Sequence, residues 1–244
     1  ASLGNSRCWV ELGSGGRVKS MFATDVGQTV AGPLLLRYAA PECDGEEPHS
    51  ECRTRSIPLP QVREGTYTLR PYGQVHEFAL PGDIQVRETI FLPMLDTKTG
   101  PTHCATYLLC ELTNEGPRTQ NLAVYGFGGF HLGSFQADVS IRTDEEHCTH
   151  GVDYSEHEDW LGALVVQPAP CRRSVTADMA MVSDIDELPS LQARSAPDRS
   201  DLVAVTENHL QLEPGRRAHI TFALAFWHHA YELRRVLGSL GDGP

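Results

Sequence analysis

Residues 111–127 spell ELTNEGPRTQNLAVYGF, two apolar runs separated by a turn. The first run belongs to CATYLLCELT at 104–113, and the second continues to Phe130 as QNLAVYGFGGF. Asn, Gly and Pro between them suit a β-turn, because Asn closes local hydrogen bonds, Gly accepts positive φ and Pro fixes its own φ. The stretch therefore predicts two strands that form an antiparallel pair across this turn.

The same alternation of strand and turn continues along most of the chain. The N-terminal CWVEL (8–12) and RVKSMF (17–22) flank Ser14-Gly15-Gly16 and predict a hairpin. The other predicted strands are PLLLRY (33–38), TYTLRPY (66–72), VHEFAL (75–80), IQVRETIFLP (84–93), LGALVVQP (161–168), SVTADMAMV (174–182), DLVAVTENHLQL (201–212) and RRAHITFALAFW (216–227). Roughly ten to fourteen such strands predict an all-β fold, a large two-sheet antiparallel β-sandwich.

The strand at 84–91 has two different faces, because alternate side chains of a strand point to opposite sides. One face carries Ile84, Val86, Glu88 and Ile90, and the other carries Gln85, Arg87, Thr89 and Phe91. The second set is mostly polar, which predicts that this side of the sheet faces water for most of its length.

The C-terminal residues follow a different pattern. HAYELRRVLGSL (229–240) has helical spacing of its apolar side chains. We therefore predict a β-sandwich domain over residues 1–228 and the start of a linker helix over 229–244. Since the chain opens without Met and stops just after this segment, we expect it to be a piece of a longer protein.

Composition and charge exclude some classes of partner. The chain has 244 residues and a formal net charge of −12, which disfavours binding to the phosphates of a nucleic acid. No apolar run is long enough to span a membrane, so we expect neither nucleic acid nor membrane as a partner. The seven cysteines are odd in number and irregularly spaced, which indicates reduced thiols and favours a cytoplasmic location.

Two groups of metal-ligating residues occur in the chain. Cys43, His49 and Cys52 form one, and His147-Cys148-Thr149-His150 forms the other. Their spacings match no common zinc site, and about a hundred residues separate the groups. Loop thiols and surface imidazoles explain both groups better, and we predict no metal and no other cofactor.

The clearest candidate for sugar contact is SEHEDW (155–160), where carboxylates precede Trp160. An aromatic ring can stack on a pyranose while neighbouring carboxylates accept hydrogen bonds from its hydroxyls. We predict carbohydrate binding by Trp160, Tyr154, Glu156 and Tyr125, with a merely solvated acidic loop as the alternative. No nucleophile elbow and no Ser, His, Asp set is evident, so we predict no catalytic residue in this chain.

Several phrases, in this order, carry a resemblance to a known group of domains. They are Leu3-Gly4-Asn5, Gly15-Gly16-Arg17-Val18, IQVRETIFLP (84–93), YLLCELTNEGPRTQNLAVYGF (107–127) and LEPGRRAHITFALAF (212–226). The chain resembles the N-terminal β-supersandwich, a galactose mutarotase-like fold, of enzymes with an (α/α)6-barrel catalytic domain. These are the cellobiose phosphorylase and cyclic glucan synthase group and the bacterial glucoamylases.

The resemblance implies a domain without catalytic residues of its own, because the catalytic carboxylates of those enzymes lie in the helical barrel. It implies a glycoside hydrolase or phosphorylase acting on glucosides, with this domain as scaffold, oligomer contact or wall of the cleft. The implied partners are carbohydrate, a downstream (α/α)6 domain in the same chain and a second copy in a homodimer. GFGGFHLGSF (126–135) departs from the tyrosine- and glutamate-bearing phrase expected of the phosphorylases.

Two other functions stay open at this point. One is a stand-alone carbohydrate-binding sandwich that uses exposed aromatic side chains such as Trp160, Tyr154 or Tyr125. The other is a small mutarotase-like sugar epimerase, for which His76 with Glu77, and His131, are the candidate acid and base.

Overall fold

The computed structural model describes residues 1–5, 7–13, 17–24, 26–42, 53–57, 65–71, 73–92, 104–131, 139–144, 149–154, 160–176 and 201–227. All regular elements in these ranges are strands, and none of these residues forms a helix that could cross a membrane. The predicted linker helix at 229–244 lies outside the described residues.

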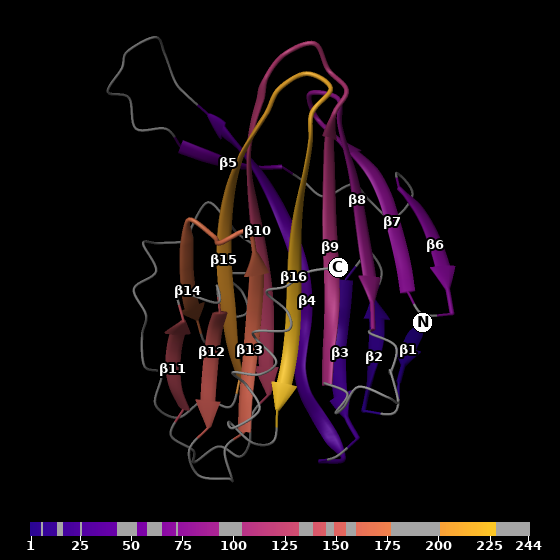
Figure 1. Cartoon of the computed structure of the whole chain (residues 1–244), viewed down its shortest axis with the longest axis vertical. Helices are drawn as coiled ribbons and strands as arrows, with labels where there is room; N and C mark the ends of the chain where they lie inside the picture. Colours follow the sequence, from indigo (N-terminus) through magenta and orange to yellow (C-terminus); the bar gives the residue numbers. More distant parts are fainter. Residues whose placement is uncertain are drawn as a thin grey trace.

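The strands of the described ranges form two antiparallel sheets of eight strands each (Figure 1). The first sheet has the order β1 (Ser2–Gly4), β2 (Cys8–Gly13), β3 (Arg17–Ala23), β4 (Gln28–Glu42), β10 (Gln120–His131), β15 (Asp201–Leu212) and β14 (Arg172–Thr176), with β5 (Arg53–Ile57) beside β4. The second has the order β11 (Val139–Asp144), β12 (Thr149–Tyr154), β13 (Trp160–Gln167), β16 (Arg217–Trp227), β9 (Cys104–Asn114), β8 (Ile84–Phe91), β7 (Gly73–Leu80) and β6 (Thr66–Arg70). The prediction of a large two-sheet antiparallel sandwich is confirmed.

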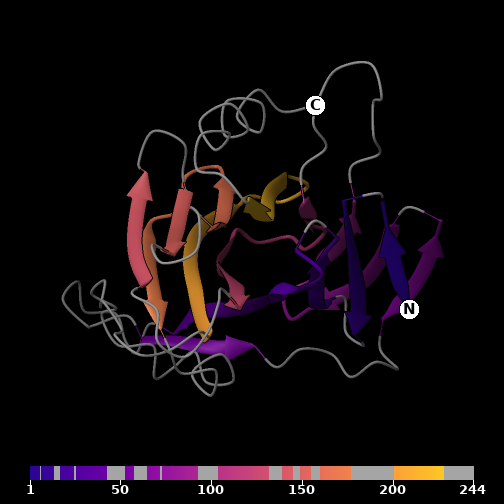
Figure 2. The same cartoon turned by 90° about the horizontal axis from the view of Figure 1, so that it is seen from below.

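The two sheets pack face to face around an apolar core, and Figure 2 shows the two layers from one end. Alternate residues of each central strand enter this core, as the period of a half-buried strand requires. In β8 the inward set is Ile84, Val86, Glu88 and Ile90, while Gln85 and Arg87 are exposed. The predicted division of this strand into two faces is therefore correct.

The turn at 114–119 does not join a hairpin, so the prediction of an antiparallel pair is wrong. β9 pairs with β8 and β16 in the second sheet, whereas β10 pairs with β4 and β15 in the first. The connection between β15 and β16 crosses between the sheets in the same way. Turn residues alone cannot distinguish a hairpin from a crossing, because both reverse the chain.

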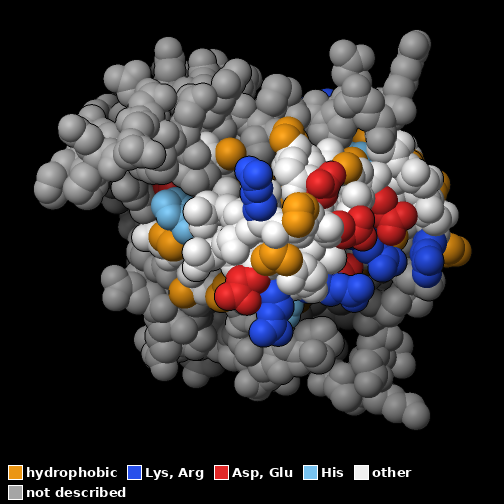
Figure 3. All heavy atoms as spheres, turned by 90° about the horizontal axis from the view of Figure 1, so that it is seen from above, with side chains coloured by type: hydrophobic (Ala, Val, Ile, Leu, Met, Phe, Trp, Pro, Cys, Tyr) orange, Lys and Arg blue, Asp and Glu red, His pale blue; other side chains and the backbone are white. Residues whose placement is uncertain are grey.

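Asn114 holds these crossings together at one end of the sandwich. Its side-chain Nδ2 donates to the carbonyls of Arg118 and Leu212, both at 2.8 Å, and its Oδ1 accepts from the amide of Gly116 at 2.9 Å. Its backbone amide donates to the carbonyl of Arg216 at 3.0 Å. Figure 3 looks onto the molecule from this side, where acidic and basic side chains are interspersed.

Glycines in GFGGF (126–130) let both the opposite sheet and the neighbouring strand β4 approach β10 closely. A Cβ on Gly126 would collide with the ring of Phe222, and one on Gly129 would collide with the carbonyl of Gly32. The register between β10 and β4 shifts between Gly128 and Phe130, which is the irregularity that strand glycines predict.

Candidate functional site

The predicted sugar-contact residues lie in different parts of the fold. Tyr154 in β12 is the register partner of Trp160 in β13, so these two backbones are adjacent at one end of the second sheet. Glu156 lies outside the described residues. Tyr125 belongs to β10 in the first sheet and is only 5% exposed, so the expectation that it is an exposed aromatic is wrong. The sugar contacts themselves stay a prediction.

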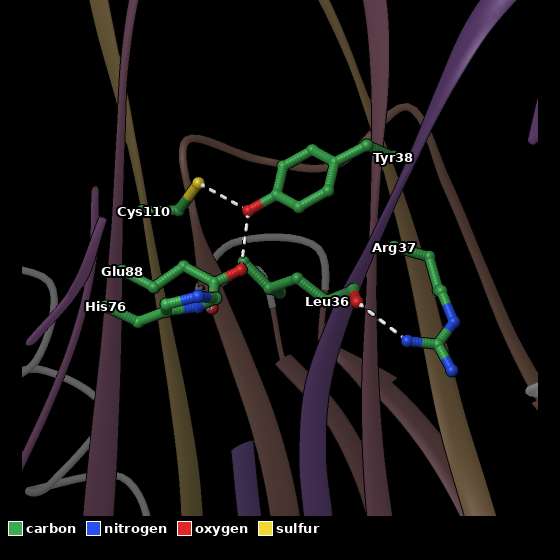
Figure 4. A network of polar contacts seen from close by, with 6 residues as sticks. All are labelled: Leu36, Arg37, Tyr38, His76, Glu88 and Cys110. Carbon is green, nitrogen blue, oxygen red and sulfur yellow. Dashed lines mark hydrogen bonds and ion pairs between the residues drawn. The ribbon is translucent and has the colours of Figure 1, made fainter. Parts of the chain in front are cut away.

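A different set of polar side chains meets between the sheets (Figure 4). Tyr38 of β4 donates its hydroxyl hydrogen to Oε1 of Glu88 in β8 at 2.7 Å. The second carboxylate oxygen, Oε2, lies 3.5 Å from Nδ1 of His76 in β7, and the tyrosine oxygen lies 3.3 Å from Sγ of Cys110 in β9. This interior polar cluster therefore joins one strand of the first sheet to three strands of the second.

Aromatic rings enclose the imidazole of this interior polar cluster. The ring of Tyr67 stacks on His76 with centroids 4.2 Å apart and planes at 5°, and Phe78 lies 4.5 Å away on a tilted plane. Gly65 also packs close to the imidazole, because a Cβ at that position would lie 2.5 Å from Nε2 of His76. The imidazole is held by contacts that leave it only 4% exposed.

Burial controls the protonation of the cluster. It raises the pKa of Glu88 above the ordinary range of a carboxyl, and the hydrogen bonds from His76 and Tyr38 oppose that rise only in part. Burial also raises the pKa values of the Tyr38 hydroxyl and the Cys110 thiol. The cluster thus favours protonated, neutral oxygen and sulfur groups in the core.

Among the described residues, the acid and base groups of the interior polar cluster are almost fully buried. General acid and base catalysis requires that the groups reach the atoms they protonate or deprotonate. Glu88 is 3% exposed, and its two oxygens already have partners in Tyr38 and His76. The arrangement satisfies a buried carboxyl and ties the sheets together.

The proposed mutarotase pair of His76 and Glu77 is not formed. The two residues follow each other in β7, so their side chains point to opposite faces. Glu77 is exposed and lies 3.6 Å from Nε of Arg87, whereas His76 meets Glu88. His131 ends β10 in the other sheet. No role for Glu88 was predicted from the sequence. A single carboxyl among the apolar residues of one strand face indicates that this carboxyl is buried and has a hydrogen-bond partner.

A second polar group lies on the outer face of the first sheet. The hydroxyl of Tyr125 donates to Oε1 of Glu207 in β15 at 3.3 Å, and Nε2 of His209 contacts the same oxygen. The side chain of His209 is 60% exposed, while that of Glu207 is 11% exposed. Of the two His-Glu pairs among the described residues, this outer His-Glu pair is the one with an exposed member, His209.

Metal binding finds no support in the described part of the chain. No group of three or more His, Cys, Asp or Glu side chains there is arranged to hold an ion. Most of the two sequence groups around Cys43 and Cys148 lie outside the described residues. Cys8, Cys104, Cys110 and Cys171 are free thiols, and the first three are buried.

Solved structures with this arrangement of strands include enzymes that act on sugars. A polysaccharide lyase superposes with a TM-score of 0.56 at 15% identity, over 96% of this chain and 35% of its own. A bacterial glucoamylase complexed with acarbose superposes with a TM-score of 0.55 at 10% identity, over 96% of this chain and 32% of its own. A galactose mutarotase related enzyme from Lactobacillus acidophilus gives 0.52 at 8% identity, over 93% of this chain and 97% of its own.

The fold is the galactose mutarotase-like supersandwich. This chain spans about a third of the polysaccharide lyase and the glucoamylase, and nearly all of the mutarotase-related enzyme. No protein-family model matches the sequence, and no curated protein matches it either. The assignment of this fold therefore depends on the three-dimensional arrangement of the strands.

Proposed function

We propose that this supersandwich is a non-catalytic domain of a larger carbohydrate-active enzyme, a glycoside hydrolase or phosphorylase that acts on glucosides. The observation that carries the proposal is the unequal coverage: the chain aligns almost completely with about a third of a glucoamylase and of a polysaccharide lyase. The domain would support a catalytic domain in the same protein, contribute an oligomer contact or form a wall of the substrate cleft.

The interior polar cluster supports a structural role for this domain. His76 and Glu88 are each under 5% exposed, and their partners Tyr38 and Cys110 come from strands of both sheets. A buried, hydrogen-bonded cluster fixes the position of one sheet relative to the other. Its buried groups are not placed to contact a substrate. We therefore assign it to the scaffold.

The test is an activity assay of the purified 244-residue chain. Mutarotation of glucose and galactose is followed by polarimetry, and hydrolysis and phosphorolysis of glucosides are followed by sugar release. We expect no turnover above the uncatalysed rate while near-ultraviolet circular dichroism confirms a folded chain. Turnover at enzymic rates would reject the proposal.

A second candidate is a mutarotase-like epimerase, which the near-complete coverage of the mutarotase-related enzyme favours. In that case the outer His-Glu pair is a better candidate for acid and base than the buried His76 and Glu88, since His209 is exposed and contacts Oε1 of Glu207. If the chain does catalyse mutarotation, His209→Gln and Glu207→Gln should each remove the activity. His219→Gln, at an exposed histidine of β16, is the matched control.

A further inference from the structure

The outer face of the first sheet carries an exposed aromatic row at its β1 edge. Trp9 of β2 is 47% exposed, and its ring meets that of half-buried Phe22 in β3 edge to face, with centroids 6.0 Å apart and planes at 65°. The register places Gly4 of β1 on one side of this pair and Thr29 of β4 on the other. Figure 1 shows β1, β2 and β3 side by side at this edge.

Gly4 leaves the indole open. As the residue opposite Trp9 it has no side chain, and even a Cβ there would come no closer than 3.8 Å to the indole. On the other side the ring of Phe22 packs against the indole in an edge-to-face arrangement. The indole is thus held in place by a neighbour while much of its surface remains in water.

Polar side chains lie beside the aromatic row, two residues along β2 at Glu11 and two to three residues along β3 at Ser20 and Lys19. Glu11 of β2 accepts from Nζ of Lys19 at 2.9 Å and from Oγ of Ser20 at 3.4 Å. The hydrogen bond from Lys19 lowers the pKa of Glu11, so the group stays a carboxylate. A carboxylate has about four lone-pair sites and an ammonium three hydrogens. Both groups therefore retain capacity for a further partner, with side chains 42% and 64% exposed.

The chemistry of these two rows selects a ligand. An apolar ring surface with hydroxyl, carboxylate and ammonium groups beside it matches a pyranose, whose face of C–H bonds is apolar and whose rim carries hydroxyls. Glu11 and Lys19 cancel each other's charge, which favours a neutral ligand. The apolar surface of one indole and one phenyl ring is also too small to form the core of a stable protein interface, since such an interface buries about 800 Å² per partner.

We infer that Trp9, Phe22, Glu11, Lys19 and Ser20 form a binding platform for neutral glucan chains on the outer face of the first sheet. A sugar ring stacks on the open indole of Trp9, and its hydroxyls donate to Glu11 and accept from Lys19. The inference rests on the proposed function, since a domain of an enzyme that acts on glucosides gains from holding the polymer near the catalytic domain.

The experiment is calorimetric titration of the folded 244-residue chain with maltoheptaose and, separately, with cellohexaose at millimolar concentration. We expect one of the two to bind and Trp9→Ala to weaken that binding by at least about tenfold. Trp9→Phe should retain part of the affinity. Leu69→Ala removes the other large apolar side chain that is exposed among the described residues and should leave the affinity unchanged.

Three outcomes overturn the platform: no heat with either glucan, an affinity that Trp9→Ala leaves unchanged, or an equal loss in Leu69→Ala. Thermal unfolding of each variant shows that it is folded at the titration temperature. Glucan binding that is insensitive to Trp9 rejects the platform and leaves the proposed function intact. Catalytic turnover by the chain together with binding that depends on Trp9 rejects the proposed function alone.

Discussion

Asn114, the last residue of β9, donates from its side chain to the carbonyl of Leu212, the last residue of β15, at 2.8 Å across 98 positions of sequence. Each residue ends a strand of a different sheet, and each is followed by a turn that crosses to the other sheet. The bond therefore links the two crossings at the point where both strands leave their sheets. The asparagine is fully buried, so its polar atoms depend on these protein partners.

Asn114→Ala should lower the free energy of unfolding by about 2–4 kcal/mol, because three side-chain hydrogen bonds are lost and the carbonyl of Leu212 is left without this donor. Urea denaturation followed by fluorescence measures the change. Asn121→Ala, at an exposed asparagine of β10, is the control and should change stability by less than about 0.5 kcal/mol. Equal effects of the two substitutions would show that the bonds of Asn114 do not stabilise the crossing.

Tyr38→Phe removes the hydroxyl that bonds Glu88 and should cost about 1–3 kcal/mol. Tyr107→Phe is the control, since the Tyr107 ring is stacked on Phe91 at the outer face of the second sheet. A double-mutant cycle of Tyr38→Phe with Glu88→Met, which removes the acceptor oxygens, should give a coupling of about 0.5–3 kcal/mol. Additive effects would contradict a direct interaction between the sheets.

The buried Glu88 should make stability depend on pH. Its pKa is raised in the folded chain, so the folded state keeps this proton at pH values where the unfolded state has released it. The stability contributed by the protonated form is complete below the unfolded pKa, near 4.5, and is lost as pH rises through the folded pKa. The contribution of Glu88 to the stability of the folded chain should therefore decrease as the pH is raised from below 4.5 toward neutrality.

Comparison with Glu88→Gln isolates this dependence. The difference in unfolding free energy between the native chain and Glu88→Gln should move in favour of the variant as pH rises above about 4.5. Urea denaturation at a series of pH values measures it, with Glu77→Gln as the control at the exposed neighbour. A difference that is constant with pH, or that moves the other way, would show that burial does not raise the pKa of Glu88.

Gly126→Ala should destabilise the sandwich by about 1–3 kcal/mol, because the new Cβ would occupy the position of the Phe222 ring and push the sheets apart. Gly4→Ala is the control, since its Cβ would make only ordinary contacts at 3.8 Å and beyond. Thermal unfolding of both variants distinguishes them. A neutral Gly126→Ala would mean that the ring of Phe222 can move without cost.

Local sequence determined most of the strands of this protein, although β1, β5, β11 and β12 are not among the predicted strands. Alternation in 84–91 gave the inward face of β8, and Pro81-Gly82 gave the β7 to β8 hairpin, where Gly82 has φ +83° and Asp83 φ 59°. Both patterns involve residues only a few positions apart. The strand face follows from the alternation of side chains, and the turn follows from the backbone conformations that Pro and Gly favour. The sandwich followed from the number of such strands.

Only the tertiary structure decided which strands became partners. The turn after Asn114 has the residues of a hairpin, yet it crosses between sheets: β9 pairs with β8 and β16, and β10 pairs with β4 and β15. The same holds for His76, whose carboxylate partner is Glu88, the residue opposite it in register on β8, and not its neighbour Glu77. Tyr38 reaches that carboxylate from the other sheet. A contact such as that of Tyr38 with Glu88, across 50 positions of sequence, is set by burial and register, which no local pattern encodes.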